Sequence, residues 1–188
     1  MNLYELAARV IEALEAECIP YMVVGALSSS VFGIPRATKD VDIVLQLQTR
    51  APLLGLEARL AGVVVFDPQV TFETLTGSVR HILTAMTKPP FIVELFELGS
   101  DPFVVARFAR RRAEWSGQIK RQVFLPTAED VIVQKLRWGR PKDLEDARDV
   151  LAVQTPAKLD MAYVTRWCVL HQTSGLLHAM LAEIAPLL

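Results

Sequence analysis

The sequence is poor in cysteine, in histidine and in long apolar runs. Its two cysteines, Cys18 and Cys168, lie in apolar segments that we expect to be helical, which favours buried thiols over a disulfide or a zinc site. The three histidines lack metal-ligand spacing. No apolar run approaches the roughly 20 residues that a membrane span needs, and the first residues lack the basic segment of a signal peptide. We therefore expect a cytoplasmic protein with no membrane partner.

Apolar residues make up 52% of the 188 residues, which predicts a substantial core and little disorder. No internal repeat, low-complexity tract or clear linker interrupts the chain. The order of segments predicts an α+β fold, with a mixed β-sheet flanked by helices and a small C-terminal helical region. We expect residues 1–100 to form the core and residues 101–188 to form a mainly helical region that packs on it as one unit.

Individual elements follow from apolar periodicity and from capping residues. Asn2 and Glu5 form a capping-box pair at the start of the first helix. Thr127 is the expected N-cap of a later helix and Gly139 its C-terminal stop. Further helices are predicted at 26–32, 52–61, 103–113, 143–153, 159–171 and 174–184, and strands at 21–24, 41–47, 63–66, 79–83, 91–98 and 123–125.

Charge is distributed unevenly along the chain. The net charge is −1, but residues 104–142 hold ten basic residues against three acidic ones, a local net charge of +7. The rest of the chain therefore carries −8. A basic face of this kind favours a polyanion such as RNA, or a triphosphate, as partner.

Two carboxylates open the second predicted strand. Asp40 and Asp42 alternate with apolar residues, so they project from one face of the strand, roughly 7 Å apart at Cα. Like charges in such a place need a compensating cation, and a divalent metal is the usual one. Glu94 interrupts another apolar strand. If the two strands are neighbours, three carboxylates gather and could hold two Mg²⁺ about 3.5–4 Å apart.

A turn at Gly25 leads from the first strand into a short helix. The N-terminus of a helix offers backbone N–H groups and a positive dipole to phosphates. The serines that follow, Ser28 to Ser30, could add hydroxyl donors. These residues are therefore candidates for binding phosphate groups.

Taken together, Gly25 and the later run Arg36-Ala-Thr-Lys-Asp40-Val-Asp42-Ile resemble the signature of the nucleotidyltransferase fold of the DNA polymerase β-like superfamily. The likeness is closer to small bacterial nucleotidyltransferases, including toxins of toxin–antitoxin pairs. Residues 125–148 are similar to the helical segment that follows the catalytic sheet in those proteins, and residues 159–167 are similar to their C-terminal helix.

The resemblance implies transfer of NMP from an NTP to an acceptor hydroxyl, with release of pyrophosphate. Possible partners are then an RNA such as tRNA, reached through the basic segment, and an antitoxin protein. Lys135 would reach the triphosphate or the acceptor. The roles implied for the other residues are ligands of Mg²⁺ or Mn²⁺ (Asp40, Asp42, Glu94) and nucleotide contacts (Gly25, Ala26, Ser28, Arg36, Thr38, Asp143).

Two positions depart from the family pattern. Ala26 stands where Gly or Ser is usual, and Glu94 stands where Asp is more often found. These departures keep open a catalytically lapsed nucleotide-binding or antitoxin-partner protein. An antibiotic-modifying nucleotidyltransferase is the other alternative, although an acidic pocket would be expected for a cationic aminoglycoside.

Several of these residues also have purely structural interpretations. Glu94 could pair with an interior arginine, and Arg36 could pair with Asp40. Asp143 could be a helix N-cap, and Lys135 could be a surface residue near the end of its helix. Trp115 and Trp138 could stack on a base, but packing in the core or at its rim is the favoured interpretation.

Overall fold

The computed structural model describes residues 1–184. The chain forms two compact units, one from Met1–Leu27 with Ala37–Leu125, and the other from Ser28–Arg36 with the chain from Pro126 onward. The expected division between residues 100 and 101 stays a prediction. The last four residues of the predicted C-terminal region lie outside the described part.

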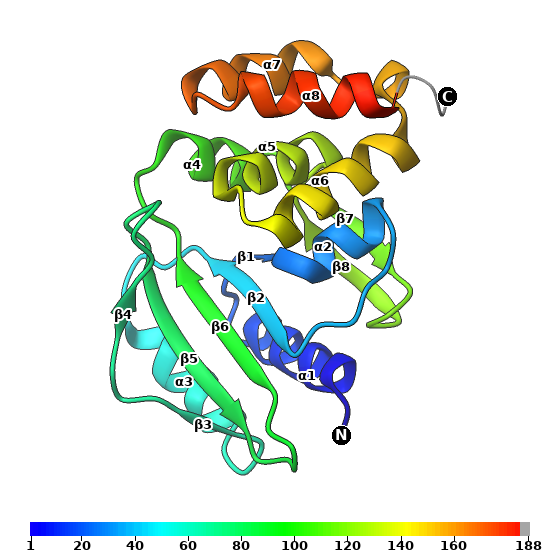
Figure 1. Ribbon diagram of the computed structural model, residues 1–188. Coiled ribbons are helices and arrows are strands. Elements are labelled where there is room, and N and C mark those ends of the chain that lie inside the picture. Colours follow the sequence, from blue (N-terminus) through cyan, green and yellow to red (C-terminus); the bar gives the residue numbers. More distant parts are fainter. Residues whose placement is uncertain (185–188) are drawn as a thin grey trace. The chain divides into compact units, whose positions relative to one another are not determined.

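A six-stranded mixed sheet dominates the first unit, in the order β1-β2-β6-β5-β3, with β4 also paired to β5. Strands β2 and β6 run parallel, and the other pairs are antiparallel. The sheet confirms the α+β class with a mixed sheet flanked by helices (Figure 1). The strands are β1 (Tyr21–Val24), β2 (Asp40–Leu45), β3 (Val64–Phe66), β4 (Thr71–Phe72), β5 (Val79–Ala85) and β6 (Ile92–Glu97).

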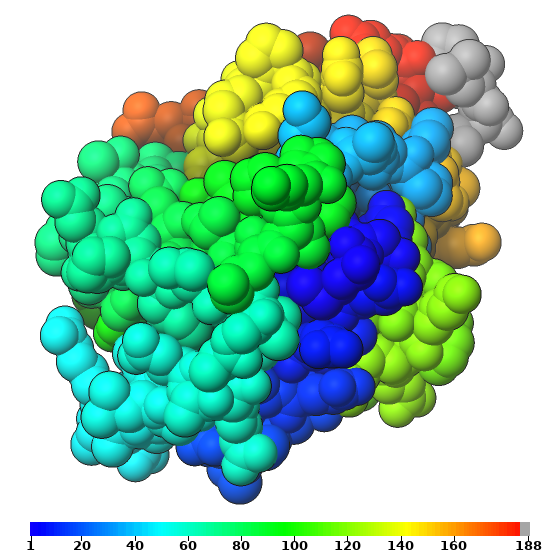
Figure 2. Space-filling model, turned by 90° about the horizontal axis from the view of Figure 1, so that it is seen from below, coloured from blue at the N-terminus to red at the C-terminus, as the bar shows by residue number. Residues whose placement is uncertain are grey.

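Three helices and a hairpin complete the first unit: α1 (Leu3–Ala16), α3 (Ala51–Arg59), α4 (Pro102–Ala109), β7 (Arg112–Ser116) and β8 (Arg121–Leu125). Helix α1 begins with the predicted capping box, and α1 and α3 lie behind the sheet in Figure 1. The single helix expected over 103–113 is wrong beyond Ala109, because the chain turns there and β7 pairs with β8. This hairpin lies beside α1 (Figure 2), where Arg121 forms ion pairs with Glu12 and Glu15.

The two faces of strand β2 differ in character. Val41, Ile43 and Leu45 point to one face and are fully buried. Val44 lies on the other face, in an apolar cluster with Met22, Val24, Phe96 and Phe108. Asp40 and Asp42 alternate with the first set, so they share the face of Val44. The acidic end of β2 is therefore followed directly, on the same face, by a buried apolar cluster.

Helices make up the second unit. Helix α2 (Gly25–Phe32) starts in the first unit and continues into the second. Helix α5 starts after Thr127, whose side chain accepts from the N–H of Asp130, and ends at Gly139 with a φ of 64°, as predicted. Within residues 1–184 no helix is both long and apolar enough to span a membrane. The remaining bounds are α5 (Ala128–Trp138), α6 (Pro141–Gln154), the short 3₁₀ helix η1 (Pro156–Lys158), α7 (Met161–Leu170) and α8 (Ser174–Ile184).

Candidate active site

Strand pairing brings the predicted acids together in the backbone. Asp40 and Asp42 are the first and third residues of β2, and the parallel register places Asp42 directly opposite Glu94 of β6. The predicted neighbourhood of these two strands is confirmed. Neighbouring strands lie about 4.7–4.9 Å apart, so the three acidic residues lie on one small area of the sheet.

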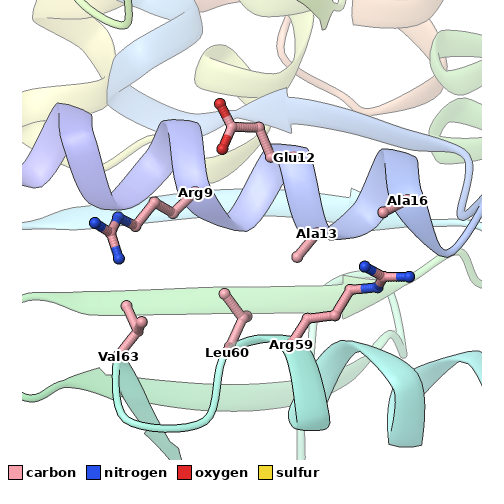
Figure 3. Close-up of a pocket in the computed structure, with 7 residues that line it drawn as sticks. All are labelled: Arg9, Glu12, Ala13, Ala16, Arg59, Leu60 and Val63. Carbon is pink, nitrogen blue, oxygen red and sulfur yellow. The ribbon is translucent and has the colours of Figure 1, made fainter.

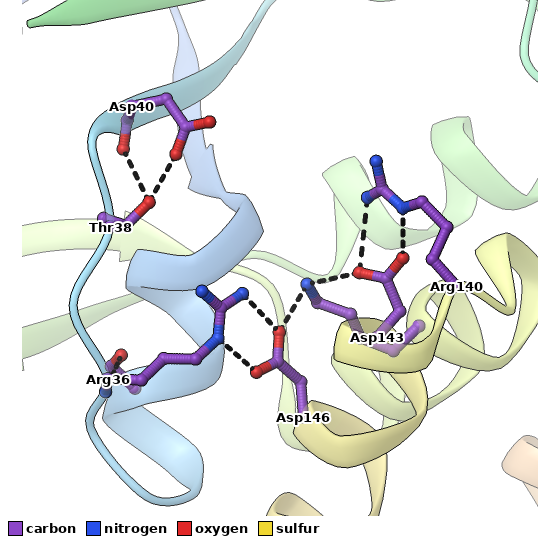
Figure 4. Close-up of polar contacts among 8 residues, drawn as sticks. Arg36, Thr38, Asp40, Arg140, Asp143 and Asp146 are labelled. Carbon is purple, nitrogen blue, oxygen red and sulfur yellow. Dashed lines mark hydrogen bonds and ion pairs between the residues drawn. The ribbon is translucent and has the colours of Figure 1, made fainter.

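Thr38 holds the first of these acids in place. Its hydroxyl donates a short hydrogen bond to Oδ1 of Asp40 and lies 3.5 Å from the backbone oxygen of the same residue (Figure 4). The loop before β2 thus fixes the orientation of the Asp40 carboxylate. The predicted nucleotide contact of Thr38 stays a prediction, and the structure gives this residue a positioning role.

Gly25 packs against the second acid. A Cβ atom built on Gly25 would lie 1.9 Å from Oδ2 and 2.8 Å from Cγ of Asp42. Gly25 also has a φ of 65°, a left-handed conformation that L side chains rarely adopt. The turn into α2 therefore needs glycine for two reasons, and it forms a cradle around the Asp42 carboxylate. Phosphate binding by Gly25 and Ala26 stays a prediction.

Glu94 forms an ion pair with an arginine, which is the structural alternative that the sequence left open. Its Oε1 lies 3.1 Å from a terminal nitrogen of Arg80 on β5, and both side chains are partly exposed. Arg80 also donates from Nε to the hydroxyl of Thr71 on β4, at 2.9 Å. Sequence reasoning missed Arg80, because only the β5–β6 register places it beside Glu94. The metal role of Glu94 stays a prediction.

The residues on this face fit a divalent cation at Asp40 and Asp42. Carboxylate oxygens are the donors that Mg²⁺ and Mn²⁺ prefer, and the turn at Gly25 packs against one of the two aspartates, Asp42. Within residues 1–184, however, no group of three or more His, Cys, Asp or Glu is arranged to hold a metal ion. The fit therefore extends to the two aspartates, while Glu94 is drawn toward Arg80.

A separate charged network lies in the second unit. Nζ of Lys135 on α5 lies 3.0 Å from Oδ1 of Asp143 and 2.7 Å from Oδ2 of Asp146, both on α6. Arg36 grips Asp146 through two hydrogen bonds of 2.7 and 3.0 Å, and Arg140 contacts Asp143 (Figure 4). Three cationic side chains thus contact two buried carboxylates. Both carboxylates are within reach because Asp143 and Asp146 lie three residues apart, on the same face of α6.

This network shifts the protonation of Asp146. Burial by itself would raise the pKa of the Asp146 carboxyl, but hydrogen bonds and charges from Arg36 and Lys135 outweigh it and hold the pKa below its ordinary value. Asp146 therefore remains ionised at neutral pH. The i, i+3 spacing of Asp143 and Asp146 was the signal in the sequence that could have found this residue.

The structural interpretations of two residues in this network are wrong. Lys135 is 4% exposed, so it is not a surface residue. Asp143 is not an N-cap, because the cap is Arg140 and Asp143 lies inside the first turn of α6. Arg36, Lys135, Asp143 and the almost fully buried Ser28 belong to the second unit. Their predicted nucleotide contacts stay predictions.

The basic segment 104–142 is less available than its charge suggests. Lys135 and Arg140 pair with acids of the second unit, and Arg121 pairs with acids of α1. Arg107 is buried over the ring of Phe103, and the guanidinium of Arg111 lies 4.0 Å from the ring centroid of Phe108. At least half of the ten basic residues are therefore held in internal contacts, and the local net charge of +7 overstates the charge offered to a polyanion.

A groove of about 710 Å³ lies elsewhere in the first unit (Figure 3). Its residues come from α1 and from the end of α3 with the turn that follows. Its arginine from α3, Arg59, already pairs with Glu17 at 2.5 Å. None of the predicted site residues lines this groove, so it is not the predicted nucleotide site. The lining residues are Arg9, Glu12, Ala13, Ala16, Arg59, Leu60 and Val63.

No protein-family model matches the chain, and no curated protein sequence matches it. Solved structures do match. The solution structure of the antibiotic-resistance factor ANT(2'')-Ia has a TM-score of 0.58 at 14% identity, covering 92% of this chain and 96% of that one. The crystal structure of ANT(2'')-Ia in complex with adenylyl-2''-tobramycin has a TM-score of 0.60 at 14% identity, covering 91% and 97%.

A third solved structure also matches over most of the chain. The crystal structure of an antigenic nucleotidyltransferase-like protein from Paracoccidioides brasiliensis has a TM-score of 0.61 at 17% identity, covering 97% of this chain and 94% of that one. At these identities the likeness concerns the fold. The path of the chain, with its mixed sheet and flanking helices, is the nucleotidyltransferase-like fold.

Proposed function

We propose that the protein is a divalent-metal-dependent nucleotidyltransferase that transfers NMP from an NTP to an acceptor hydroxyl. The observation that carries this proposal is the pair Asp40 and Asp42 on one face of β2, held by Thr38 and by the Gly25 cradle. A nucleotidyltransferase-like fold over most of the chain supports it. A neighbour of similar fold is in complex with adenylyl-2''-tobramycin, and this also supports the proposal.

Each part of the site has a task in this reaction. Asp40 and Asp42 would hold Mg²⁺ or Mn²⁺, which supplies positive charge to the triphosphate when bound. The acceptor oxygen bonds to the α-phosphorus as the bond from that phosphorus to the bridging oxygen breaks. Pyrophosphate leaves, and the hydroxyl proton passes to water. Thr38 and Gly25 keep the two carboxylates oriented, so little reorganisation is needed during the reaction.

The leading proposal for the acceptor is an RNA such as tRNA, with a toxin-like role and a cognate antitoxin. The observation that favours RNA is the β7–β8 hairpin, where Trp115 is 62% exposed and Arg112 and Lys120 are exposed as well. An exposed aromatic ring can stack on an unpaired base, and exposed cations on the same hairpin can contact phosphates. The expectation that Trp115 packs at the rim does not fit this exposure.

A hydroxyl of a small antibiotic is the second candidate acceptor. It is favoured by the neighbour whose complex contains adenylyl-2''-tobramycin. The internal contacts of half the basic segment also weaken the charge argument that disfavoured it.

A labelling experiment separates these proposals. The protein is incubated with each labelled NTP, with Mg²⁺ or Mn²⁺, and with total tRNA or an aminoglycoside panel. Label on one acceptor class identifies it, and Asp42→Asn should abolish labelling. Glu97→Gln is the matched control, because Glu97 lies on the other face of β6 and pairs with His81. Metal-dependent NTP binding without transfer would indicate the lapsed protein, and absence of both would refute the proposal.

A further inference from the structure

Arg80 occupies a distinctive position on the acidic face of the sheet. Strand β6 lies between β2 and β5, so Glu94 faces Asp42 on one side and Ile82 on the other. Arg80 is two residues from Ile82 and therefore points to the same face. The acidic face thus carries Asp40, Asp42 and Glu94, with one guanidinium beside the last of them.

The guanidinium is fixed at two points. Its Nε donates to Thr71 Oγ1 at 2.9 Å, and a terminal nitrogen donates to Glu94 Oε1 at 3.1 Å. Arginine has five N–H donors and keeps its charge at any pH that a protein tolerates. Two donors are used in this way. In the part of the chain that the structure describes, the other three have no protein acceptor, and the side chain is 30% exposed.

Glu94 is long enough to make this contact. An aspartate at this position would be one methylene shorter. The extra methylene lets the carboxylate reach across to β5, where it meets Arg80 at 3.1 Å. The length of the Glu94 side chain and the position of Arg80 therefore belong together, because the two side chains form one ion pair.

We propose that Arg80 takes the place of a second metal ion: the acidic face binds one divalent cation, at Asp40 and Asp42, and the Arg80–Glu94 pair supplies the second positive group. This inference rests on the proposed function, since it concerns the metal content of the same site. Three carboxylates and one guanidinium leave a net charge of −2, which one divalent cation neutralises. The other donors of Arg80, whose side chain is 30% exposed, can then bind phosphate oxygens.

Counting bound Mn²⁺ tests the proposal without an activity measurement. Electron paramagnetic resonance on the nucleotide-free full chain should detect one bound Mn²⁺ in the wild type and in Glu94→Gln. Arg80→Gln releases Glu94 and should bind two, while Arg80→Gln combined with Glu94→Gln should return to one. Arg80→Lys keeps the charge and should remain at one. His81→Gln is the matched control on the same strand, because His81 points to the opposite face.

Each other outcome has a definite meaning. Two Mn²⁺ ions in the wild type, with one lost in Glu94→Gln, would overturn the proposal, and so would an Arg80→Gln protein, folded by circular dichroism, that still binds one. The failure of the proposed function looks different: Asp42→Asn would then bind Mn²⁺ as the wild type does. If Arg80→Gln does not fold, two ions in Arg80→Lys would by themselves overturn the proposal.

Discussion

Replacing Gly25 with alanine tests the cradle around Asp42 most directly. The new Cβ would lie 1.9 Å from Oδ2 of Asp42, whereas a carbon and an oxygen in contact lie about 3.3–3.6 Å apart. The carboxylate must therefore retreat by about 1.5 Å, or the turn must move by the same amount. In addition, alanine at a φ of 65° is strained by about 1–2 kcal/mol.

Gly62→Ala is the matched control for the backbone strain. Gly62 has a φ of 75°, but an added Cβ there meets nothing within 4 Å. Gly62→Ala should lower the free energy of unfolding by about 1–2 kcal/mol, because backbone strain is the only cost that it adds. Gly25→Ala should lower the free energy of unfolding by about 1–3 kcal/mol more, because its new Cβ also overlaps the Asp42 carboxylate. Urea unfolding in the absence of metal measures both values.

Metal binding gives the second measurement. Disturbance of the groups that orient a metal ligand typically weakens metal affinity about 10–100-fold. At a Mn²⁺ concentration of about 100 Kd, the wild type gains about 2.7 kcal/mol of stability, and a tenfold weaker site gains about 1.4 kcal/mol. Equal stability losses in the two alanine variants, together with an undiminished Mn²⁺ effect in Gly25→Ala, would refute the cradle.

Three further predictions concern other contacts. Asp146→Asn should lower the free energy of unfolding by roughly 3–5 kcal/mol at neutral pH. The wild type should lose this contribution as pH falls through the lowered pKa of Asp146, so below about pH 4 the variant should lose less stability on acidification than the wild type does. Asp149→Asn, where burial raises the pKa, should show neither effect in the same unfolding series. Thr38→Val should weaken Mn²⁺ binding about 10-fold or more by calorimetry, and Thr84→Val is the exposed control. Trp115→Ala should reduce RNA labelling about 10-fold while NTP binding is unchanged; equal labelling would remove the hairpin from the RNA proposal.

Much of the fold follows from local sequence. The capping box at Asn2, the cap at Thr127 and the stop at Gly139 act within a few residues, so both of these helices were predicted correctly at those ends. The segment after Ala109 was predicted wrongly. Its residues have no strong local preference, and only pairing of β7 with β8 makes them a strand. A local pattern cannot reveal a pairing partner that lies several residues away.

In the candidate site, too, some features follow from local sequence and others depend on tertiary pairing. Alternation along β2 placed Asp40 and Asp42 on one face, because side-chain direction in a strand depends only on residue parity. Glu94 was suspected because an acid within an apolar strand needs a partner. Its actual partner, Arg80, depends on the register between β5 and β6, which the sequence does not contain in any local form.

By itself, the sequence determined which side chains are acidic, which face of each strand they occupy and where the turn at Gly25 must lie. Only the tertiary structure decided what they contact: Asp42 against Gly25, Glu94 against Arg80, and Lys135 between Asp143 and Asp146. The physical reason is one of range. Parity, capping and turn preference act within one turn or one strand, whereas strand register and helix packing are set by the burial of the whole chain.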